Sequence, residues 1–318
     1  MAQALRSTPI GELGAEHIRC FEIGGLSVRV ESDLPFNENT FLPKFETFII
    51  QDPADISVVF RHHFSLPDLE LASLGQPVYR QPPWAVHQQD GRWIYIGIVP
   101  GRGETAPFVI GIFSDDHCRG DIYHPSPQVF ERGGWSSLTG FPSDQLILSH
   151  ALANYQACYL HSSGLIINDQ GLLFVGRSGA GKSTILKMVL DHGQVLCDDR
   201  NVVRYQRGEF WAYGSWSHGE LPIVSNARAQ LRMILFLQQA EENRLQRITD
   251  KSEVVRLLLA SLIRPRETRM WWEQSLELIE QIARDVPAAK LHFDTSGKVV
   301  EILDEIVGRV PDDTSVAD

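Results

Sequence analysis

The sequence predicts an α/β domain organised around a phosphate-binding loop (P-loop), preceded by a β-rich domain. The apolar run Leu172 to Val175 is typical of a short buried strand. It enters a glycine-rich stretch, 176–183, that fits the pattern G-x-x-x-x-G-K-[ST] and is followed by the apolar face of a helix. The first 135 residues or so instead alternate in hydrophobicity between turn signals, as strands do.

Composition excludes several classes of protein. Of 318 residues, 43% are hydrophobic and 22% charged, which is typical of a globular chain with a large core. The net charge of −11 argues against a nucleic-acid partner. No apolar run is long enough to cross a bilayer and the N-terminal residues lack a signal-peptide core, so we expect a cytoplasmic protein without a membrane partner. Four well-separated cysteines form no CxxC pair, which argues against disulfides and a zinc site.

Residues 1–140 are predicted to form the β-rich domain, and they reveal no chemistry. Tight turns at Gly24-Gly25 and Asp90-Gly91 separate alternating segments. Four of the six histidines in this part are candidate metal ligands, but their spacings match no ligand motif, so we expect no metal site. They are His62, His63, His117 and His124. The predicted strands are a hairpin within Cys20 to Glu31, Phe45 to Ile50, Ile56 to Phe60, a hairpin of Trp84 to His87 with Trp93 to Val99, and Pro107 to Phe113.

A glycine-rich stretch ending at Gly140 and Pro142 marks the boundary to a second domain, 141–308, and 309–318 are expected to be a frayed tail. Ser143 is expected to cap a helix from Asp144 to Tyr159 whose apolar face packs on the nucleotide-binding domain.

The run Leu160 to Ile167 is predicted to be a strand that turns at 168–171 and leads directly into the P-loop strand. His161 is then held one strand away from the P-loop. It is either a core residue or a group that faces the phosphates.

Each part of the predicted P-loop has a physical task. Its glycines let the backbone turn around an anion and aim N–H groups at it, and the helix beginning near Lys182 adds its positive dipole end. Lys182 would reach the β- and γ-phosphates, and the Ser183 hydroxyl would bind Mg²⁺. The predicted nucleotide-binding residues are Gly176, Arg177, Ser178, Gly179, Ala180, Gly181, Lys182, Ser183 and Thr184.

Two adjacent aspartates follow the next predicted strand. Gly193 is expected to end the P-loop helix, and Gln194 to Cys197 lead into Asp198-Asp199. Carboxylates at the end of a strand beside a P-loop suit Mg²⁺ binding and proton abstraction, and a helix cap or surface turn is the alternative. The segment 214–222, which contains Glu220, is a candidate substrate or metal loop.

The remaining chain completes the second domain. Arg264, Arg266 and Arg269 could hold phosphate or an acidic peptide, or form a solvated basic turn. The predicted elements are a hairpin of Val202 to Tyr205 with Phe210 to Tyr213, a buried strand from Met233 to Leu237, helices from Ser252 to Arg264 and Trp272 to Ala283, and closing segments at 291–293 and 299–303.

From His161 to Asp304 the order of features resembles the HPr kinase/phosphorylase family. The shared features are a histidine before the strand–turn–strand into the P-loop, the P-loop itself, the pair in VLCDD, a glutamate-bearing loop, and a strand followed by E-N-R in FLQQAEENRLQRI. The resemblance implies a phosphoenolpyruvate-carboxykinase-like kinase fold that uses ATP and Mg²⁺. It implies that His161 and Asp199 form the acid/base pair beside Lys182, with Asp199 expected to accept the proton of the acceptor hydroxyl and His161 to orient or assist it. It also implies that Asp198 and Glu220 help Ser183 to hold the metal.

Two features differ from that family. Thr184 stands where HPr kinases carry glutamate, and Glu220 leads into LPIVSN instead of the longer glycine-rich signature of bifunctional enzymes. The chain therefore looks like the HPr-kinase-related proteins found with peptide-modification or other biosynthetic systems.

The resemblance implies a kinase that transfers the γ-phosphoryl group of ATP to a Ser/Thr-type hydroxyl on a peptide, protein or small molecule. It is compatible with a homo-oligomer, since relatives form multimers. The alternatives are a P-loop NTPase that couples hydrolysis to transport or regulation, and a nucleotide-sensing module without chemistry.

Overall fold

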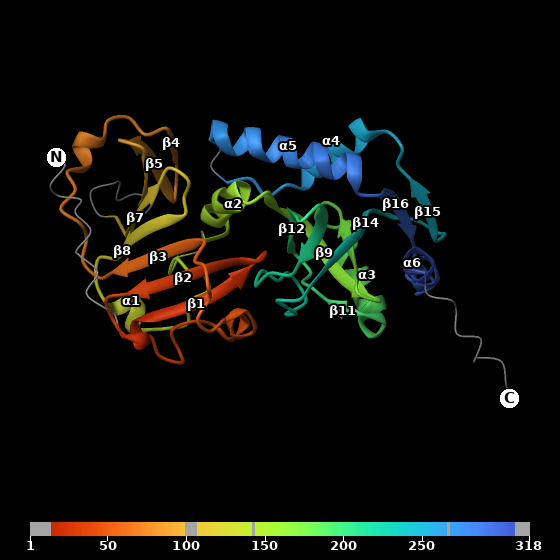
Figure 1. The fold of residues 1–318 in the computed structure, drawn as a ribbon, viewed down its shortest axis with the longest axis horizontal. Helices are drawn as coiled ribbons and strands as arrows, with labels where there is room; N and C mark the ends of the chain where they lie inside the picture. Colours follow the sequence, from red (N-terminus) through yellow and green to blue (C-terminus); the bar gives the residue numbers. More distant parts are fainter. Residues whose placement is uncertain (1–13, 99–106, 142–143, 266–267, 309–318) are drawn as a thin grey trace. The chain divides into compact units, whose positions relative to one another are not determined.

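The chain is a mixed α/β structure with two large β-sheets, described by a computed structural model for residues 14–98, 107–141, 144–265 and 268–308 (Figure 1). It divides into two compact units. The first comprises the residues up to 22 together with 26–151, and the second comprises 23–25 and the residues from 152. The division therefore falls within helix α2 (Asp144–Asn154), not at the predicted position 140. In the described part of the chain, no helix is both long and apolar enough to cross a membrane.

The first unit is built on an eight-stranded sheet in the order β1-β2-β3-β8-β7-β6-β5-β4. Strands β2, β3 and β8 run parallel, while β4 to β8 pair antiparallel in sequence. The strands are β1 (Ile18–Ile23), β2 (Leu26–Ser32), β3 (Val58–His63), β4 (Tyr79–Gln81), β5 (Trp84–Gln89), β6 (Arg92–Gly97), β7 (Val109–Ser114) and β8 (Arg119–Tyr123). The short helices are η1 (Ala15–His17), η2 (Pro43–Phe48), η3 (Leu71–Leu74) and α1 (Gln128–Glu131).

One predicted strand of this unit is wrong. The segment expected as a strand over 45–50 begins instead as the 3₁₀ helix η2, with Pro43 in its first turn. Phe45 and Phe48 are both buried, and a separation of three residues places them on one face of a 3₁₀ turn. Proline at a helix start and this spacing together favour the helix.

Three histidines of the first unit, His62, His63 and His124, hydrogen-bond to protein groups. His62 Nδ1 lies 3.0 Å from His124 Nε2, and His62 Nε2 donates to the Leu138 carbonyl at 2.9 Å. His63 lies 2.9 Å from both Asp33 and Asp121. These contacts account for the three imidazoles within the fold of this unit. The buried His87 is different, since neither of its ring nitrogens has a hydrogen-bond partner among the described residues.

The helix predicted over 144–159 is shorter than expected. α2 ends at Asn154, and Gln156 has a φ of +53°, which is incompatible with a continuing helix. Strand β9 (Ala157–Ile167) begins directly afterwards, so Cys158 lies on a strand and not on a helix face. The predicted cap Ser143 lies outside the described residues.

The second unit contains another eight-stranded sheet, in the order β10-β9-β12-β13-β14-β16-β15 with β11 beside β9. β10 also pairs parallel with β14, so β9, β10, β12, β13 and β14 form a closed ring of hydrogen-bonded strands. The strands are β10 (Gln170–Val175), β11 (Gln194–Val195), β12 (Arg200–Gln206), β13 (Glu209–Tyr213), β14 (Arg228–Gln239), β15 (Arg244–Arg247) and β16 (Ala288–Phe293).

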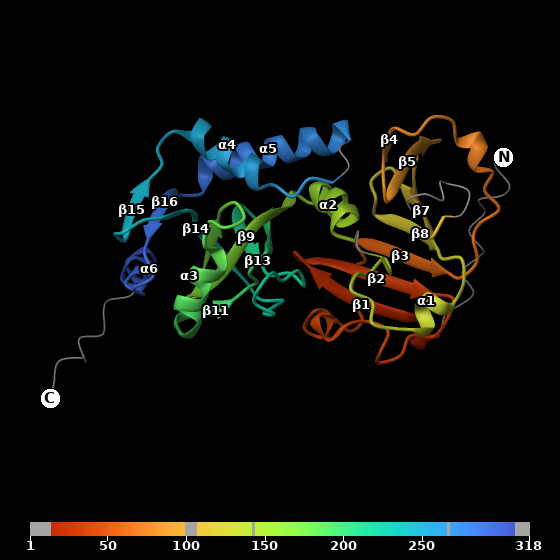
Figure 2. The same cartoon turned by 180° about the vertical axis from the view of Figure 1, so that it is seen from behind.

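Helices cover both faces of this sheet, which explains its continuous apolar runs. On β10, Leu172 and Phe174 pack with α3 (Lys182–Val189) and α6 (Val299–Val307). The alternate residues Leu173 and Val175 pack with α4 (Lys251–Ser261) and α5 (Arg269–Asp285). Figures 1 and 2 show α4 and α5 on one side of the strands and α3 and α6 on the other.

Two turns hold the P-loop segment in place. Asn168 and Asp169 both have positive φ, as a two-residue hairpin turn between β9 and β10 requires. After α3, a 3₁₀ turn, η4 (Leu190–His192), precedes Gly193, which is extended rather than left-handed. Gly193 therefore caps η4 in an extended conformation, whereas α3 itself ends at Val189 with Leu190 as its cap. Glycine is needed at position 193 because a Cβ would collide with the carbonyl oxygen of Ile166.

Candidate functional site

The predicted P-loop connects the carboxyl end of β10 to the first turn of α3. Gly179 has a φ of +80° and Gly181, immediately before α3, a φ of +100°. A Cβ on Gly181 would lie 2.6 Å from the ring of Phe293, so backbone conformation and space both require glycine there. The chain turns tightly and begins the helix at Lys182, as the sequence pattern predicts.

The turn leaves backbone donors available to an anion. Within the described residues, no backbone–backbone hydrogen bond uses the N–H groups of Gly179, Gly181, Lys182 or Ser183. The first N–H groups of a helix have no partner inside the helix, and they lie at the positive end of its dipole. This backbone therefore fits a phosphate group.

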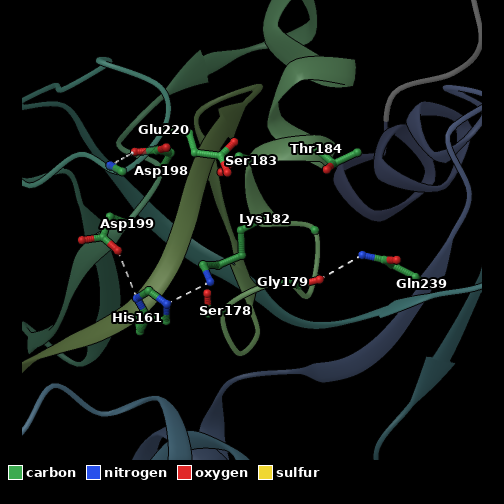
Figure 3. A pocket seen from close by; sticks show the side chains of 12 residues that line it. His161, Ser178, Gly179, Lys182, Ser183, Thr184, Asp198, Asp199, Glu220 and Gln239 are labelled. Atoms are coloured by element: carbon green, nitrogen blue, oxygen red, sulfur yellow. Dashed lines mark hydrogen bonds and ion pairs between the residues drawn. The ribbon is translucent and has the colours of Figure 1, made fainter.

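Lys182 is folded into this turn and is 8% exposed. Its Nζ donates to the carbonyls of Gly176 at 2.9 Å and Arg177 at 3.3 Å, and lies 3.0 Å from His161 Nε2 (Figure 3). Burial lowers the pKa of the Lys182 ammonium, and the carboxylates of Asp199 and Asp198 act in the opposite direction.

His161 reaches the P-loop because β9 runs antiparallel to β10, with Ser162 opposite Val175. On its other edge β9 pairs with β12, where His161 stands opposite Arg200, the residue after Asp199. His161 Nδ1 lies 3.2 Å from Asp199 Oδ1. An ammonium can only donate and an ionised carboxylate can only accept, so His161 is neutral and carries its proton on Nδ1.

Asp199 has contacts on both carboxylate oxygens. Oδ1 faces His161, while Oδ2 accepts from Ser217 Oγ at 3.2 Å and forms an ion pair with Arg200 Nε at 3.2 Å. Burial acts to raise the pKa of Asp199, but the hydrogen bond to His161 and the charge of Arg200 outweigh it and lower the pKa. The carboxyl is therefore ionised at neutral pH.

Asp198 and Glu220 lie on the other side of the site. Asp198 is 2% exposed, and its oxygens accept the backbone N–H groups of Gly219 at 2.5 Å and Leu221 at 2.8 Å. Glu220 is exposed and lies 3.6 Å from Lys187. Asp198 thus holds the 219–221 backbone, and Glu220 stands at the rim (Figure 3).

These side chains surround one open cavity of about 240 Å³. Small-molecule pockets of about 300–1,000 Å³ are usual, so this cavity suits the phosphate end of a nucleotide. Of the predicted P-loop residues, Gly176, Arg177 and Ala180 do not line it. The lining residues are His161, Ser178, Gly179, Gly181, Lys182, Ser183, Thr184, Asp198, Asp199, Gly219, Glu220 and Gln239.

Gln239 is a site residue that the sequence does not reveal. It ends β14, the strand parallel to β10, and its Nε2 donates to the Gly179 carbonyl at 3.0 Å. The pairing of β14 with β10 spans about 60 residues of sequence, so only a topology prediction could have identified it. Arg200, the residue after Asp199, and Ser217, within the predicted 214–222 segment, also contact Asp199, although neither was predicted individually.

The residues around Ser183 fit a magnesium ion. Mg²⁺ usually binds through one or two carboxylates, waters and substrate phosphates, and the cavity brings Ser183, Asp198 and Glu220 together. Each Asp198 oxygen has a second lone pair beyond its backbone hydrogen bond. Across the described ranges, no cluster of three or more His, Cys, Asp or Glu residues forms a complete protein cage for a metal.

Of the arginines after α4, Arg264 and Arg269 do not line this cavity. Arg269 forms an ion pair with Glu273 at 2.8 Å on the surface of α5, and its side chain is 91% exposed. Arg266 lies outside the described residues. The described geometry therefore offers no support for the phosphate-binding interpretation of Arg269.

Comparison with known proteins does not assign a family. No protein-family model matches the chain, and no curated protein matches it. Among solved structures, the Hpr(Ser) kinase/phosphatase from Coxiella burnetii matches with a TM-score of 0.29 and 12% identity, over 47% of this chain and 88% of that chain. At this TM-score the match decides neither the fold nor the activity.

Proposed function

We propose that the chain is an ATP- and Mg²⁺-dependent kinase that transfers the γ-phosphoryl group to a hydroxyl, with a Ser/Thr-type hydroxyl on a peptide or protein as the expected acceptor. The single observation that carries the proposal is the convergence of Lys182, His161 and Asp199 in one cavity. This convergence joins an anion-binding backbone to an imidazole and an ionised carboxylate that together can take up a proton. Phosphoryl transfer to a hydroxyl needs both.

In this proposal the glycine-rich backbone and Lys182 bind and neutralise the phosphates. Ser183, Asp198 and Glu220 would hold a Mg²⁺ ion, whose chemistry there would be neutralisation of the phosphate charge. The pair of His161 and Asp199 takes the proton of the acceptor hydroxyl as its oxygen attacks the γ-phosphorus. General-base assistance of this kind contributes about 10²–10⁴-fold to rate.

The pair of His161 and Asp199 also favours a kinase over a nucleotide-sensing module. A sensor needs the anion-binding backbone, but it does not need a neutral imidazole oriented by a carboxylate at the edge of the phosphate cavity. An NTPase could use the same pair to activate water. The fate of the phosphate therefore decides between a kinase and an NTPase.

The test is incubation of the full chain with Mg²⁺ and ATP labelled on the γ-phosphate, together with Ser- and Thr-containing peptides and proteins encoded near this chain. Mass spectrometry then locates the label. Transfer to a hydroxyl, absent in a Lys182→Met variant and retained in Lys251→Met at the exposed start of α4, supports the kinase. Label released only as inorganic phosphate would establish a hydrolase. Failure to bind ATP would end the proposal.

A further inference from the structure

Lys182 and His161 form a hydrogen bond with each other. That bond uses the ammonium that the nucleotide would need and the imidazole nitrogen that the acceptor hydroxyl would need. Lys182 has three N–H donors, and the structure gives it three acceptors: the carbonyls of Gly176 and Arg177, and His161 Nε2. All its donors are therefore in use. A phosphate group that binds Lys182 must displace at least one of these contacts.

The contact most exposed to displacement is the one to His161. His161 and Lys182 both line the cavity, whereas Gly176 and Arg177 do not. A phosphate entering the cavity meets the ammonium on the side that it shares with the imidazole. The residues that supply the two carbonyls do not line the cavity, so those contacts can persist.

Displacement leaves a lone pair on His161 that faces the cavity. A phosphate oxygen is an acceptor, so it cannot replace the ammonium as a donor to Nε2. Asp199 keeps the proton on Nδ1, since its Oδ1 lies 3.2 Å away. Nε2 is then free to accept a proton from a hydroxyl.

The carboxylate of Asp199 is a poorer candidate than His161 Nε2 for the atom that accepts the proton. Its Oδ1 faces His161, and its Oδ2 already has Ser217 and Arg200 as partners. Oδ2 therefore has no lone pair left for an acceptor hydroxyl, and Oδ1 keeps only one beside His161. The sequence prediction gave proton acceptance to Asp199 and an orienting or assisting role to His161, and these contacts favour the reverse.

We infer that nucleotide binding activates His161 as the general base. In the empty site Lys182 masks His161 Nε2. The triphosphate draws Lys182 away and Nε2 then takes the acceptor proton, with Asp199 as a positioning residue. This inference rests on the proposed kinase function. The acceptor oxygen forms a bond to the γ-phosphorus while the bond from that phosphorus to the β–γ bridging oxygen breaks. The bond electrons leave with ADP, and the hydroxyl proton passes to His161.

Such masking has a functional consequence. Without a nucleotide, an acceptor hydroxyl finds no proton acceptor at His161, so the reactive arrangement forms only after the donor substrate is in place. The inference therefore defines a binding order, with the nucleotide before the productive acceptor complex.

The test is ¹⁵N NMR of the histidine side chains in the full chain, labelled with ¹⁵N-histidine and titrated with Mg²⁺ and the non-hydrolysable analogue AMPPNP. His161→Gln identifies the signal. Without a nucleotide we expect a protonated Nδ1 and a hydrogen-bonded Nε2. At saturation the Nε2 resonance should move downfield, because any water that replaces the ammonium is a weaker donor. Lys182→Met should show the downfield position without a nucleotide, and the matched surface variant Lys251→Met should not.

Calorimetry with AMPPNP on the same sample separates the two hypotheses. If AMPPNP binds and the Nε2 resonance does not move, or if the empty site carries the proton on Nε2, the switch is wrong and the kinase proposal stands. If AMPPNP does not bind, both proposals fall. Asp199→Asn supplies a third readout, since loss of the charged partner should let the His161 proton redistribute between Nδ1 and Nε2.

Discussion

Asp199→Asn should lower the rate of ATP turnover about 100-fold while leaving nucleotide affinity almost unchanged. Asparagine keeps the shape of the side chain and can still accept the Nδ1–H of His161, but it removes the negative charge. With 3.2 Å between Nδ1 and Oδ1, the charge centres of an imidazolium and the carboxylate are about 4 Å apart, which corresponds to about 4 kcal/mol at an effective dielectric constant of about 20.

Solvent reduces that figure. The side chains of His161 and Asp199 are 30% and 22% exposed, so screening leaves about 3 kcal/mol of stabilisation for the imidazolium that forms as the proton is transferred. At about 1.4 kcal/mol per tenfold change, this is a loss of about 10²-fold in rate. It lies at the lower end of the general-base range of about 10²–10⁴.

The assay is steady-state consumption of ATP with Mg²⁺, supplemented by the acceptor once it is known, with the AMPPNP dissociation constant measured by calorimetry. The matched control is Asp169→Asn, since Asp169 is exposed in the β9–β10 turn at a φ of +59°, where asparagine is equally suited. Wild-type turnover in Asp199→Asn would contradict the acid/base assignment. A large loss of AMPPNP affinity with unchanged turnover would mean that Asp199 acts in binding instead.

Three further predictions concern binding and stability. Lys182→Met should weaken AMPPNP binding about 10- to 100-fold in calorimetry, since hydrogen bonds to charged groups contribute about 1.5–3 kcal/mol each; an unchanged affinity would contradict its role. Gly179→Ala should destabilise the fold by roughly 1–2 kcal/mol, the strain of a left-handed backbone. Gly181→Ala should destabilise it more, because its Cβ would also collide with the ring of Phe293. Equal melting temperatures of the two variants would refute this. Burial lowers the pKa of His124 to about 4, so between pH 6.5 and 4 the unfolded chain binds a proton that the folded chain does not. The contribution of His124 to the free energy of unfolding should therefore be fully present above pH 6.5 and fall by roughly 3 kcal/mol towards pH 4. Urea titrations should show a smaller fall in His124→Gln than in the wild type. Identical pH profiles of the two proteins would contradict this.

Local patterns predicted most elements of the second unit. The strand entering the P-loop, the helix beginning at Lys182 and the β12–β13 hairpin are where their sequences place them. Each depends on neighbours within a few residues, such as the positive-φ pair Arg207 and Gly208 in that hairpin. Short-range physics decides such features, so one sequence is sufficient.

The incorrect predictions depend on competing short-range signals or on distant neighbours. An apolar segment beginning with Pro43 is compatible with a strand and with a 3₁₀ turn, and the aromatic core of the first unit decides for the turn. The helix α2 ends at Asn154 because the chain must begin β9, which pairs on both edges with later strands.

By itself, the sequence determined that a strand, a glycine-rich turn and a helix follow one another with Lys182 at the helix start. It also supplied candidates, His161 and Asp199, without fixing the distance between them. Only the tertiary structure brought these two side chains to 3.2 Å and placed Gln239 on the loop. The physical reason is that β9, β12 and β14 are joined by hydrogen bonds between strands far apart in sequence, and the free energy of that pairing depends on the whole sheet rather than on any one segment.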